Sequence, residues 1–243
     1  MDHTTPHLVR RVLALLLAAT VGCSSGELVM PDPVDGGENV ALTKFLGDDQ
    51  TGTVGEELLT PLVVRVLTER EHPVLGRKVV FLSVDTASGV VSPDTAVTNE
   101  EGKATARWVL GTVPGSHVVT AQLVGGEAEN QSAEFRAAAR AAAPDTLRPT
   151  IALTQPGSRK SPAVTPPQVH VVDRYGNPVP DVAVAWQVTA GGGQVQEAIT
   201  HTDADGNSTA QWTLGDRLGA HRLTVTIGNV RGSPITFTAM VLF

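Results

Sequence analysis

Apolar and polar residues alternate with a period of two along several stretches of the chain. In KATARWVL, residues 103–110, every second residue is apolar, and Trp108 is the largest of them. RLTVTI, residues 222–227, repeats the pattern, with apolar side chains on one face and arginine and threonine on the other. A period of two is typical of a β-strand with one buried face. We therefore predict strands whose apolar faces, including Trp108, point into a core.

Turn signals separate these stretches. Glycine occurs with asparagine, aspartate or proline in YGNP at 175–178 and DGN at 205–207, and three glycines follow one another at 191–193. Such clusters favour loops. The alanine-rich FRAAARAAAPD at 135–145 suggests a helix, but Pro144 ends it before the roughly 12 residues that an isolated helix needs. Short strands without helices between them predict an all-β fold, an antiparallel sandwich of two sheets.

The chain contains two copies of one unit. TNEEGKATARWVLG, which starts at Thr98, aligns without a gap on TDADGNSTAQWTLG, which starts at Thr202. Upstream of these segments, Phe81 aligns with Trp186. Such an internal repeat predicts two homologous domains in tandem.

We place these domains at residues 40–140 and 145–243, with a short junction between them. Their aromatic residues share the inward faces of the predicted strands with alanine, leucine and valine. We expect six of these side chains in the cores, namely Trp108, Trp186, Trp212, Phe81, Phe135 and Phe237. Glycines recur at the equivalent turns, namely Gly102, Gly206, Gly111 and Gly215.

The N-terminus has the residue order of a secretory signal. Arg10 and Arg11 precede an apolar run from Val12 to Val21, which is too short for a permanent membrane-spanning helix. Cys23, the only cysteine of the chain, follows this run. TVGC resembles a bacterial lipobox, although Thr20 stands where leucine is usual.

This resemblance implies that residues 1–22 are a lipoprotein signal peptide and that Cys23 carries a lipid that anchors the protein to a membrane. Residues 23–39 are rich in glycine, proline and acidic residues and are expected to form a flexible tether. Ser24 stands where inner-membrane lipoproteins of enteric bacteria often have aspartate, which implies the outer membrane, with domains facing the periplasm or the cell surface. An ordinary signal peptide with an incidental cysteine and an uncleaved signal anchor are the alternatives.

The charge of the chain excludes one class of partner. Its formal net charge is −7, and no basic stripe with interleaved aromatic residues occurs. Such a chain lacks the electrostatic means to hold a phosphate backbone. We therefore expect no nucleic-acid binding.

We find no catalytic motif and no metal-ligand spacing in the sequence, and we expect neither enzymatic activity nor a cofactor. His117 and His221 occupy equivalent positions in the two copies, which favours a structural role over two identical active sites. The tryptophans share their parity with core residues, which argues against a carbohydrate-binding platform.

One stretch resembles a calcium loop. Asp203, Asp205 and Asn207 alternate as the first ligands of an EF-hand do, but the glycine falls at the fourth position and not at the sixth. The first copy has Lys103 at the position of Asn207, and an ammonium group cannot bind calcium. We interpret the stretch as a turn in which Gly206 takes a positive φ, with a weak calcium site in the second copy as the alternative.

The order DRYGNPVPDVAVAW, TDADGNSTAQWTLG and SPITFTA resembles the bacterial immunoglobulin-like (Ig-like) domain of the invasin and intimin group. The first copy is similar throughout, although Glu71-His72-Pro73 replaces Gly-Asn-Pro. The resemblance covers about residues 46–243 and implies stalk and adhesion modules of bacterial surfaces. It implies no receptor-binding tip, because in such adhesins binding is usually credited to a distal lectin-like domain.

Two functions follow as hypotheses. The first is a non-catalytic, lipid-anchored envelope protein whose Ig-like domains act as an adhesion or protein-interaction module, with a protein or surface as partner. The second is a passive spacer without a ligand of its own. An accessory part of a carbohydrate-active system is a third hypothesis, although the two domains leave no residues for a catalytic domain.

Overall fold

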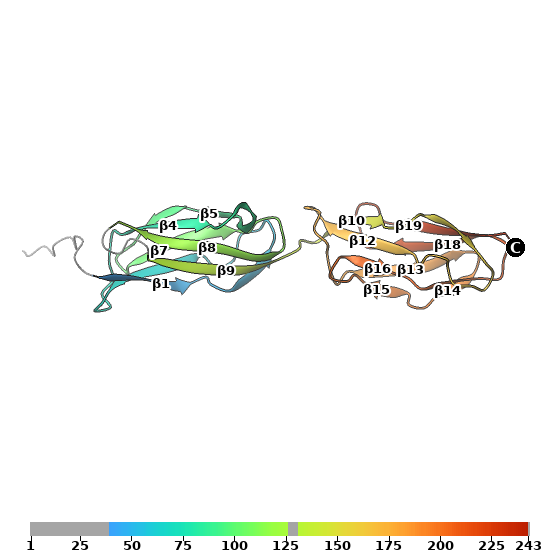
Figure 1. Cartoon of the computed structure of the whole chain (residues 1–243), viewed down its shortest axis with the longest axis horizontal. Coiled ribbons are helices and arrows are strands. Elements are labelled where there is room, and N and C mark those ends of the chain that lie inside the picture. The colour runs from blue at the N-terminus through green and yellow to red at the C-terminus, as the bar shows by residue number, and fades with distance from the viewer. Residues whose placement is uncertain (1–38, 126–130, 243) are drawn as a thin grey trace, which may run out of the picture. The chain divides into compact units, whose positions relative to one another are not determined.

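The computed structural model describes residues 39–125 and 131–242. Within these ranges the regular structure consists of strands and one three-residue 3₁₀ helix (Figure 1). The predicted all-β fold is therefore confirmed. Cys23 and the predicted signal peptide lie outside the described residues.

We call strands β1 to β9 domain 1. Their bounds are β1 (Val40–Leu46), β2 (Gln50–Thr53), β3 (Leu62–Thr68), β4 (Lys78–Ser83), β5 (Val90–Ser92), β6 (Thr95–Val97), β7 (Lys103–Val109), β8 (Gly115–Val124) and β9 (Ser132–Arg140), with the 3₁₀ helix η1 (Thr86–Ser88) after β4. One sheet has the order β1-β3-β7-β5 and the other the order β2-β9-β8-β4-β6. The first two strands thus belong to different sheets.

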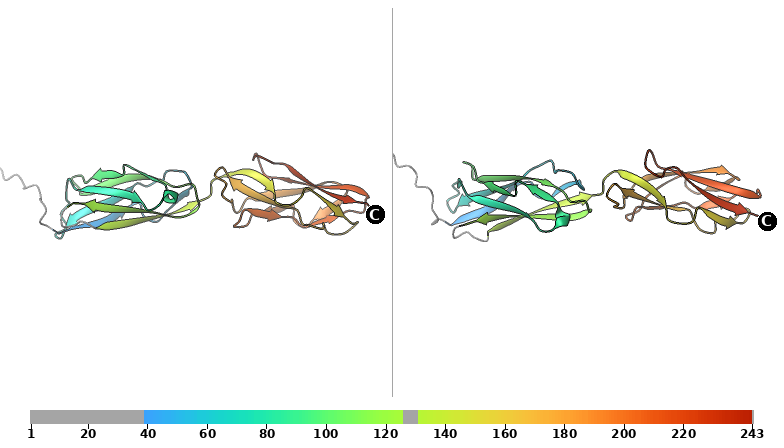
Figure 2. Two further views of the ribbon diagram at one scale, coloured as in Figure 1. Left: turned by 45° about the horizontal axis from the view of Figure 1, so that its top comes forward. Right: turned by 90° about the horizontal axis from the view of Figure 1, so that it is seen from above.

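We call strands β10 to β19 domain 2. Their bounds are β10 (Pro144–Pro149), β11 (Thr154–Gly157), β12 (Gln168–Asp173), β13 (Ala183–Ala190), β14 (Gly193–Val195), β15 (Ile199–His201), β16 (Asn207–Thr209), β17 (Trp212–Leu214), β18 (Gly219–Thr226) and β19 (Ile235–Val241). The sheet β11-β19-β18-β13-β15 corresponds to the five-stranded sheet of domain 1. Opposite it lie the smaller sheets β10-β12-β16 and β14-β17 (Figure 2).

Most strand pairs are antiparallel, but each domain has one parallel pair of strands. In domain 1, β2 runs parallel to β9 from Gln50, opposite Ala137, to Thr53, opposite Arg140. In domain 2, β11 runs parallel to β19 with a register of the same length. The strand that enters each five-stranded sheet first is therefore paired with the last strand of the domain.

Alternate residues of the facing sheets form one hydrophobic core in each domain. The core of domain 1 draws on residues between Val40 and Ala142, and that of domain 2 on residues between Leu147 and Val241. Since each sheet buries one face, a second layer is needed to cover it. The domain boundaries that we predicted at residues 22, 39, 140 and 145 stay predictions.

One predicted strand is interrupted. The repeat suggests a continuous strand through residues 207–214, like β7 in domain 1, but the structure has β16 and β17 with a break at Ala210 and Gln211. The break lies where the partner changes, since β16 pairs with β12 and β17 pairs with β14. In domain 1 a single β7 spans both partners, β3 and β5.

Candidate functional site

The candidate calcium stretch forms a turn whose carboxylate is already engaged. Asp203 Oδ1 accepts hydrogen bonds from the main-chain N–H groups of Asp205 (3.0 Å) and Asn207 (2.8 Å). In domain 1, Asn99 Oδ1 accepts the equivalent bonds from Glu101 (3.0 Å) and Lys103 (2.9 Å). The amide oxygen of Asn99 accepts the same two hydrogen bonds as the carboxylate of Asp203, so the turn does not require a charge. Among the described residues, no group of three potential metal ligands comes together.

The recurrent glycines stand where a side chain would collide with main chain. Gly102 and Gly206 have φ of +71° and +72°, and a Cβ would lie 2.5 Å from Val66 O in domain 1 and 2.6 Å from Val171 O in domain 2. Gly111 and Gly215 lie against the loops after β4 and β13, where a Cβ would come within 2.5 Å of a carbonyl oxygen. Both pairs therefore preserve close approaches of the backbone.

The two equivalent histidines are buried and make identical contacts. His117 Nδ1 accepts a hydrogen bond from Gly111 N–H (3.3 Å), and its Nε2 lies 2.8 Å from Val113 O. His221 repeats this arrangement with Gly215 N–H (3.3 Å) and Arg217 O (2.9 Å). The tautomer with its proton on Nε2 satisfies both contacts. Each ring thus ties together the two ends of the loop before its own strand.

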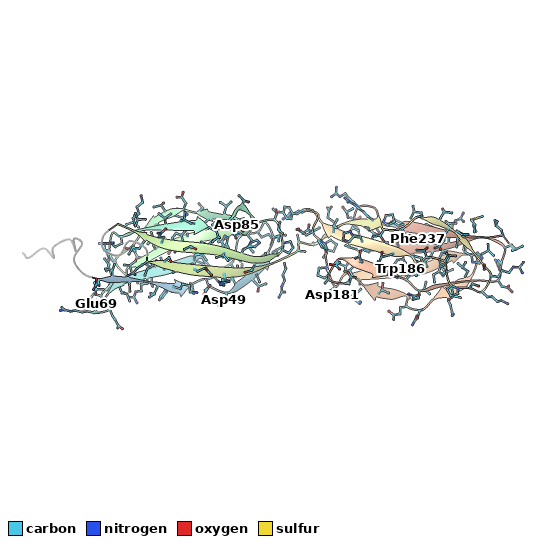
Figure 3. The ribbon with its side chains drawn as sticks, viewed as in Figure 1. Asp49, Glu69, Asp85, Asp181, Trp186 and Phe237 are labelled. Carbon is cyan, nitrogen blue, oxygen red and sulfur yellow. The ribbon has the colours of Figure 1, made fainter. Side chains whose placement is uncertain are left out.

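The six aromatic residues expected in the cores are all at most 3% exposed. Figure 3 labels Trp186 and Phe237, whose ring centroids lie 6.3 Å apart in the core of domain 2. Trp108 Nε1 donates to Ser88 O (2.7 Å), whereas the equivalent Trp212 Nε1 is buried without an acceptor. At this position the two domains differ, because three glycines stand where domain 1 has η1 and Gly89.

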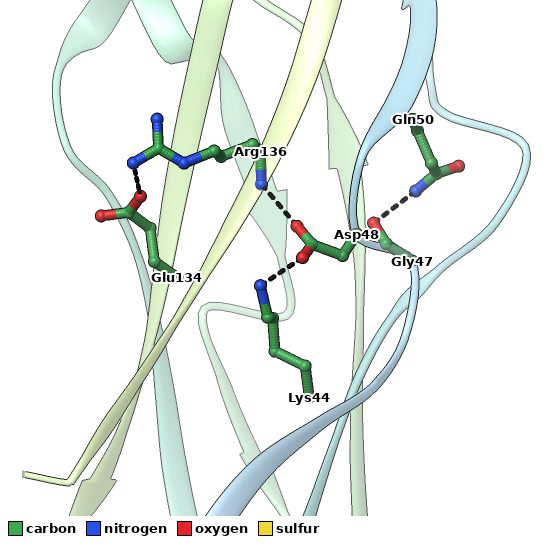
Figure 4. A network of polar contacts seen from close by, with 6 residues as sticks. All are labelled: Lys44, Gly47, Asp48, Gln50, Glu134 and Arg136. Atoms are coloured by element: carbon green, nitrogen blue, oxygen red, sulfur yellow. Dashed lines mark hydrogen bonds and ion pairs between the residues drawn. The ribbon is translucent and has the colours of Figure 1, made fainter.

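A polar clip that the sequence analysis missed holds the crossover between β1 and β2 (Figure 4). Asp48 Oδ1 accepts a hydrogen bond from the main-chain N–H of Arg136 in β9 (2.9 Å), and its other oxygen pairs with Lys44 of β1. Burial raises the pKa of Asp48, but the bonds from Lys44 and from Arg136 N–H outweigh it and hold the pKa below its ordinary value. Asp48 thus joins the first strand of the domain to the last.

The corresponding contact in domain 2 uses main chain instead of a side chain. Thr238 N–H of β19 donates to Leu153 O at 2.7 Å. Since a carbonyl oxygen replaces the carboxylate, neither alignment nor residue type at this position points to the contact.

The sequence analysis also missed a pair of glutamine contacts, which the alignment of the two copies could have revealed. Gln50 binds both the N–H (3.1 Å) and the C=O (2.9 Å) of Thr60. Gln155 binds Thr165 in the same way, at 2.7 and 2.8 Å. The glutamine and the threonine recur at the same spacing in the two copies, so the alignment of the copies points to this contact. Each glutamine fixes the loop that follows β2 or β11.

Asp173 supplies the one carboxylate of the DRYGNP turn. It accepts hydrogen bonds from Tyr175 N–H, from Asn177 N–H and Nδ2, and from Ala142 N–H in the segment before β10. Burial raises the pKa of Asp173, and these bonds more than compensate, so that the pKa is lowered. Its role is to shape the turn and to hold the chain where it enters domain 2.

The outward faces of the two five-stranded sheets differ in chemistry. On domain 1, Leu82, Val84, Val97 and Val124 are all more than 40% exposed on β4, β6 and β8 or directly after β4. On domain 2, the corresponding face carries a row of threonines, in which Thr224 Oγ1 lies 3.2 Å from both Thr189 Oγ1 and Thr236 Oγ1. Domain 1 thus presents an apolar strip and domain 2 a hydroxyl row.

In the described part of the chain, we find no helix with the length and apolar character needed to cross a membrane.

Comparison with known proteins agrees with this architecture. Residues 163–240 match the family model of the bacterial Ig-like domain, group 1. A comparison with curated protein sequences gave no match.

Several solved structures resemble the chain. The Escherichia coli adhesin FdeC is 18% identical, with a TM-score of 0.51, over 83% of this chain and 63% of that structure. InvD of Yersinia pseudotuberculosis is 17% identical, with a TM-score of 0.49, over 83% of this chain and 57% of that structure. Invasin, described as a bacterial integrin-binding protein, is 20% identical, with a TM-score of 0.35, over 84% of this chain and 39% of that structure.

The chain therefore spans less than two thirds of each of these structures, and at such identities the likeness to FdeC shows the fold alone. The family match lies in domain 2, and the aligned repeat extends the same unit to domain 1. The matched family is one of Ig-like domains and not of enzymes. Residues 163–240 thus match a bacterial Ig-like domain, as the repeated turn and W-x-L-G segments predicted, and the chain shares its fold with the adhesin FdeC.

Proposed function

We propose that this protein is a non-catalytic, lipid-anchored component of the bacterial envelope whose Ig-like domains act as an adhesion or protein-interaction module. The observation that carries the proposal is the match of residues 163–240 to the bacterial Ig-like family. The fold shared with the adhesin FdeC is consistent with it.

The apolar strip of domain 1, as defined above, supports contact with a protein partner. These exposed apolar side chains, interspersed with Lys78 and Gln122, offer apolar contacts on one face of the sheet. We therefore expect the partner to be a protein with an apolar patch of its own.

The anchor is proposed from the sequence around Cys23. A lipid on this residue would keep both domains close to a membrane, and Ser24 favours the outer membrane. Replacement of Cys23 by alanine should release the protein from the membrane fraction and abolish labelling with an acyl precursor. An unlabelled parent protein would contradict the lipid anchor.

Protease treatment of intact cells, followed by crosslinking to neighbouring proteins, tests the interaction. A cleaved domain 2 would place the module on the cell surface, and a protected one in the periplasm. The crosslinked partner should be lost in a Leu82→Asp, Val97→Asp variant and kept in a Thr189→Asp, Thr236→Asp variant. A partner that stays bound to both variants would exclude the apolar strip as the contact.

A passive spacer is the second candidate, and the parallel pairing of the second and last strands of each domain favours it, because the chain enters and leaves each pair at opposite ends. A spacer should tolerate loop substitutions in domain 2 but not deletion of a whole domain. An adhesion module should lose partner binding when those loops are changed.

A further inference from the structure

In each domain a parallel pair joins the second strand of the domain to its last strand. In β2 and β9, register partners run from Gln50 and Ala137 to Thr53 and Arg140. Since both strands run in the same direction, a pull on the start of β2 and on the end of β9 acts along the pair in opposite directions. The same holds for β11 and β19, from Thr154 and Thr238 to Gly157 and Val241.

The direction of the pull decides how hydrogen bonds share the load. In a parallel pair pulled from opposite ends, the bonds lie across the force and are strained together. In an antiparallel pair pulled at its open end, the bonds break one after another, so each step needs little force. With the same number of hydrogen bonds, the parallel pair pulled from opposite ends therefore withstands a higher force than the antiparallel pair, because several bonds must break in one event.

We propose that the two domains are load-bearing elements in which the β2–β9 and β11–β19 pairs are the parts that resist a pull on the chain ends. The inference rests on the proposed function in one respect only: the force would arise between a membrane anchor and a bound partner. The resistance itself is a property of the fold.

The two domains hold the start of this parallel strand pair, which we call the clasp, by different contacts. In domain 1, Asp48 lies two residues before the start of β2 and binds both Lys44 of β1 and the N–H of Arg136 in β9. β1 is itself paired with β3 in the other sheet, so the clip joins the β2–β9 pair to that sheet. In domain 2, the bond from Thr238 N–H to Leu153 O takes this place. Substitution of one side chain can therefore weaken domain 1 and leave domain 2 unchanged.

Single-molecule pulling on the full chain tests the load path. Held by its two ends, each molecule should show two unfolding events, one for each domain. In a second geometry, handles on Ser116→Cys and Ala138→Cys, in a Cys23→Ser background, pull on exposed register partners near the open end of the β8–β9 hairpin. Domain 1 should then unfold at roughly half the force or less, because unfolding under force is governed by the barrier along the pulled direction. Equal forces in the two geometries would overturn the proposal.

A pair of matched variants tests the clip. Asp48→Ala removes two polar contacts at the clasp, and Asn99→Ala removes two in a turn between β6 and β7. Under constant force on the chain ends, Asp48→Ala should accelerate one of the two events about tenfold and leave the other at the parent rate. Asn99→Ala should leave both rates close to those of the parent, even if it lowers the denaturant midpoint.

If Asn99→Ala accelerates unfolding under force as much as Asp48→Ala, the clip has no special role and the proposal is wrong. If both variants unfold at parent rates, Asp48 carries no load and the clip is again refuted. Neither measurement involves a partner or a membrane. A failure here is therefore distinguishable from a failure of the proposed adhesion function, which crosslinking on cells decides.

Discussion

His221 Nδ1 accepts a hydrogen bond from the N–H of Gly215, six residues earlier, as His117 does from Gly111 in the other domain. The ring is fully buried in domain 2. A histidine repeated at this position therefore closes a loop and does not take part in chemistry at the surface.

Replacement of His221 by phenylalanine should destabilise domain 2. The change leaves Gly215 N–H and Arg217 O without their partners, and a buried polar group that loses its hydrogen bond costs about 1–3 kcal/mol. Urea unfolding followed by tryptophan fluorescence measures the free energy. His201→Phe, at an exposed position of β15, serves as the control and should change it little. An equal loss in both variants would contradict the role of the loop bonds.

The cost of a side chain at the glycine of the repeated turn can be measured against a second glycine of domain 2 with a similar backbone conformation. Gly206 has φ of +72° and a Cβ there would lie 2.6 Å from Val171 O, whereas Gly176 has φ of +88° with nothing within 4 Å. Gly176→Ala should cost about 1 kcal/mol for the left-handed conformation alone. Gly206→Ala should cost clearly more, because it adds a collision with main chain. Denaturant midpoints of the two variants decide this, and a smaller loss at Gly206 would be the contrary result.

The two equivalent tryptophans should respond differently to phenylalanine. Trp108→Phe and Trp212→Phe remove the same atoms from the two cores, but only Trp108 Nε1 has an acceptor, Ser88 O. Trp108→Phe should therefore cost about 1 kcal/mol more. Calorimetry of each variant compares the two losses. Trp212→Ala should cost about 3–5 kcal/mol as a truncation in a packed core, and an unchanged thermal midpoint would place Trp212 outside it.

Acid should weaken the clip of domain 1. The pKa of Asp48 is lowered in the folded protein from an ordinary value of 3.8, so the unfolded chain binds a proton more readily than the folded one. The stabilisation is therefore complete above the unfolded pKa and is lost as the pH falls through the folded pKa. Parent and Asp48→Asn should differ in unfolding free energy at neutral pH and converge in strong acid. A difference that does not change between these conditions would show that the charge is irrelevant.

The local features of the fold could be predicted from the sequence. Alternation along KATARWVL placed Trp108 on the inward face, and the register of the two copies identified the turns at Gly102 and Gly206. These features depend on neighbouring residues, whose side chains alternate strictly in a strand. The break between β16 and β17 could not be predicted in this way, because the alternation of residues 207–214 matches that of the continuous strand β7.

The same limit applies to the candidate site. Gln50 and Gln155 recur in the alignment with their partners, so closer comparison of the copies could have found them. Asp48 could not be found, since an acidic loop residue reads the same whether it is solvated or bonded to a strand 88 positions further along the chain. The group that takes the place of Asp48 in domain 2 is the carbonyl oxygen of Leu153, and every residue type has such an oxygen.

The sequence by itself determined the strand class, the duplication, the turn glycines and the inward aromatic residues, because each is written in the spacing of nearby residues. Only the tertiary structure decided that the second and last strands of each domain pair in parallel, that Asp48 fastens one such pair, and that Trp212 lacks the acceptor of Trp108. These relations join residues far apart in the chain, and they exist only once the two sheets have closed around a core.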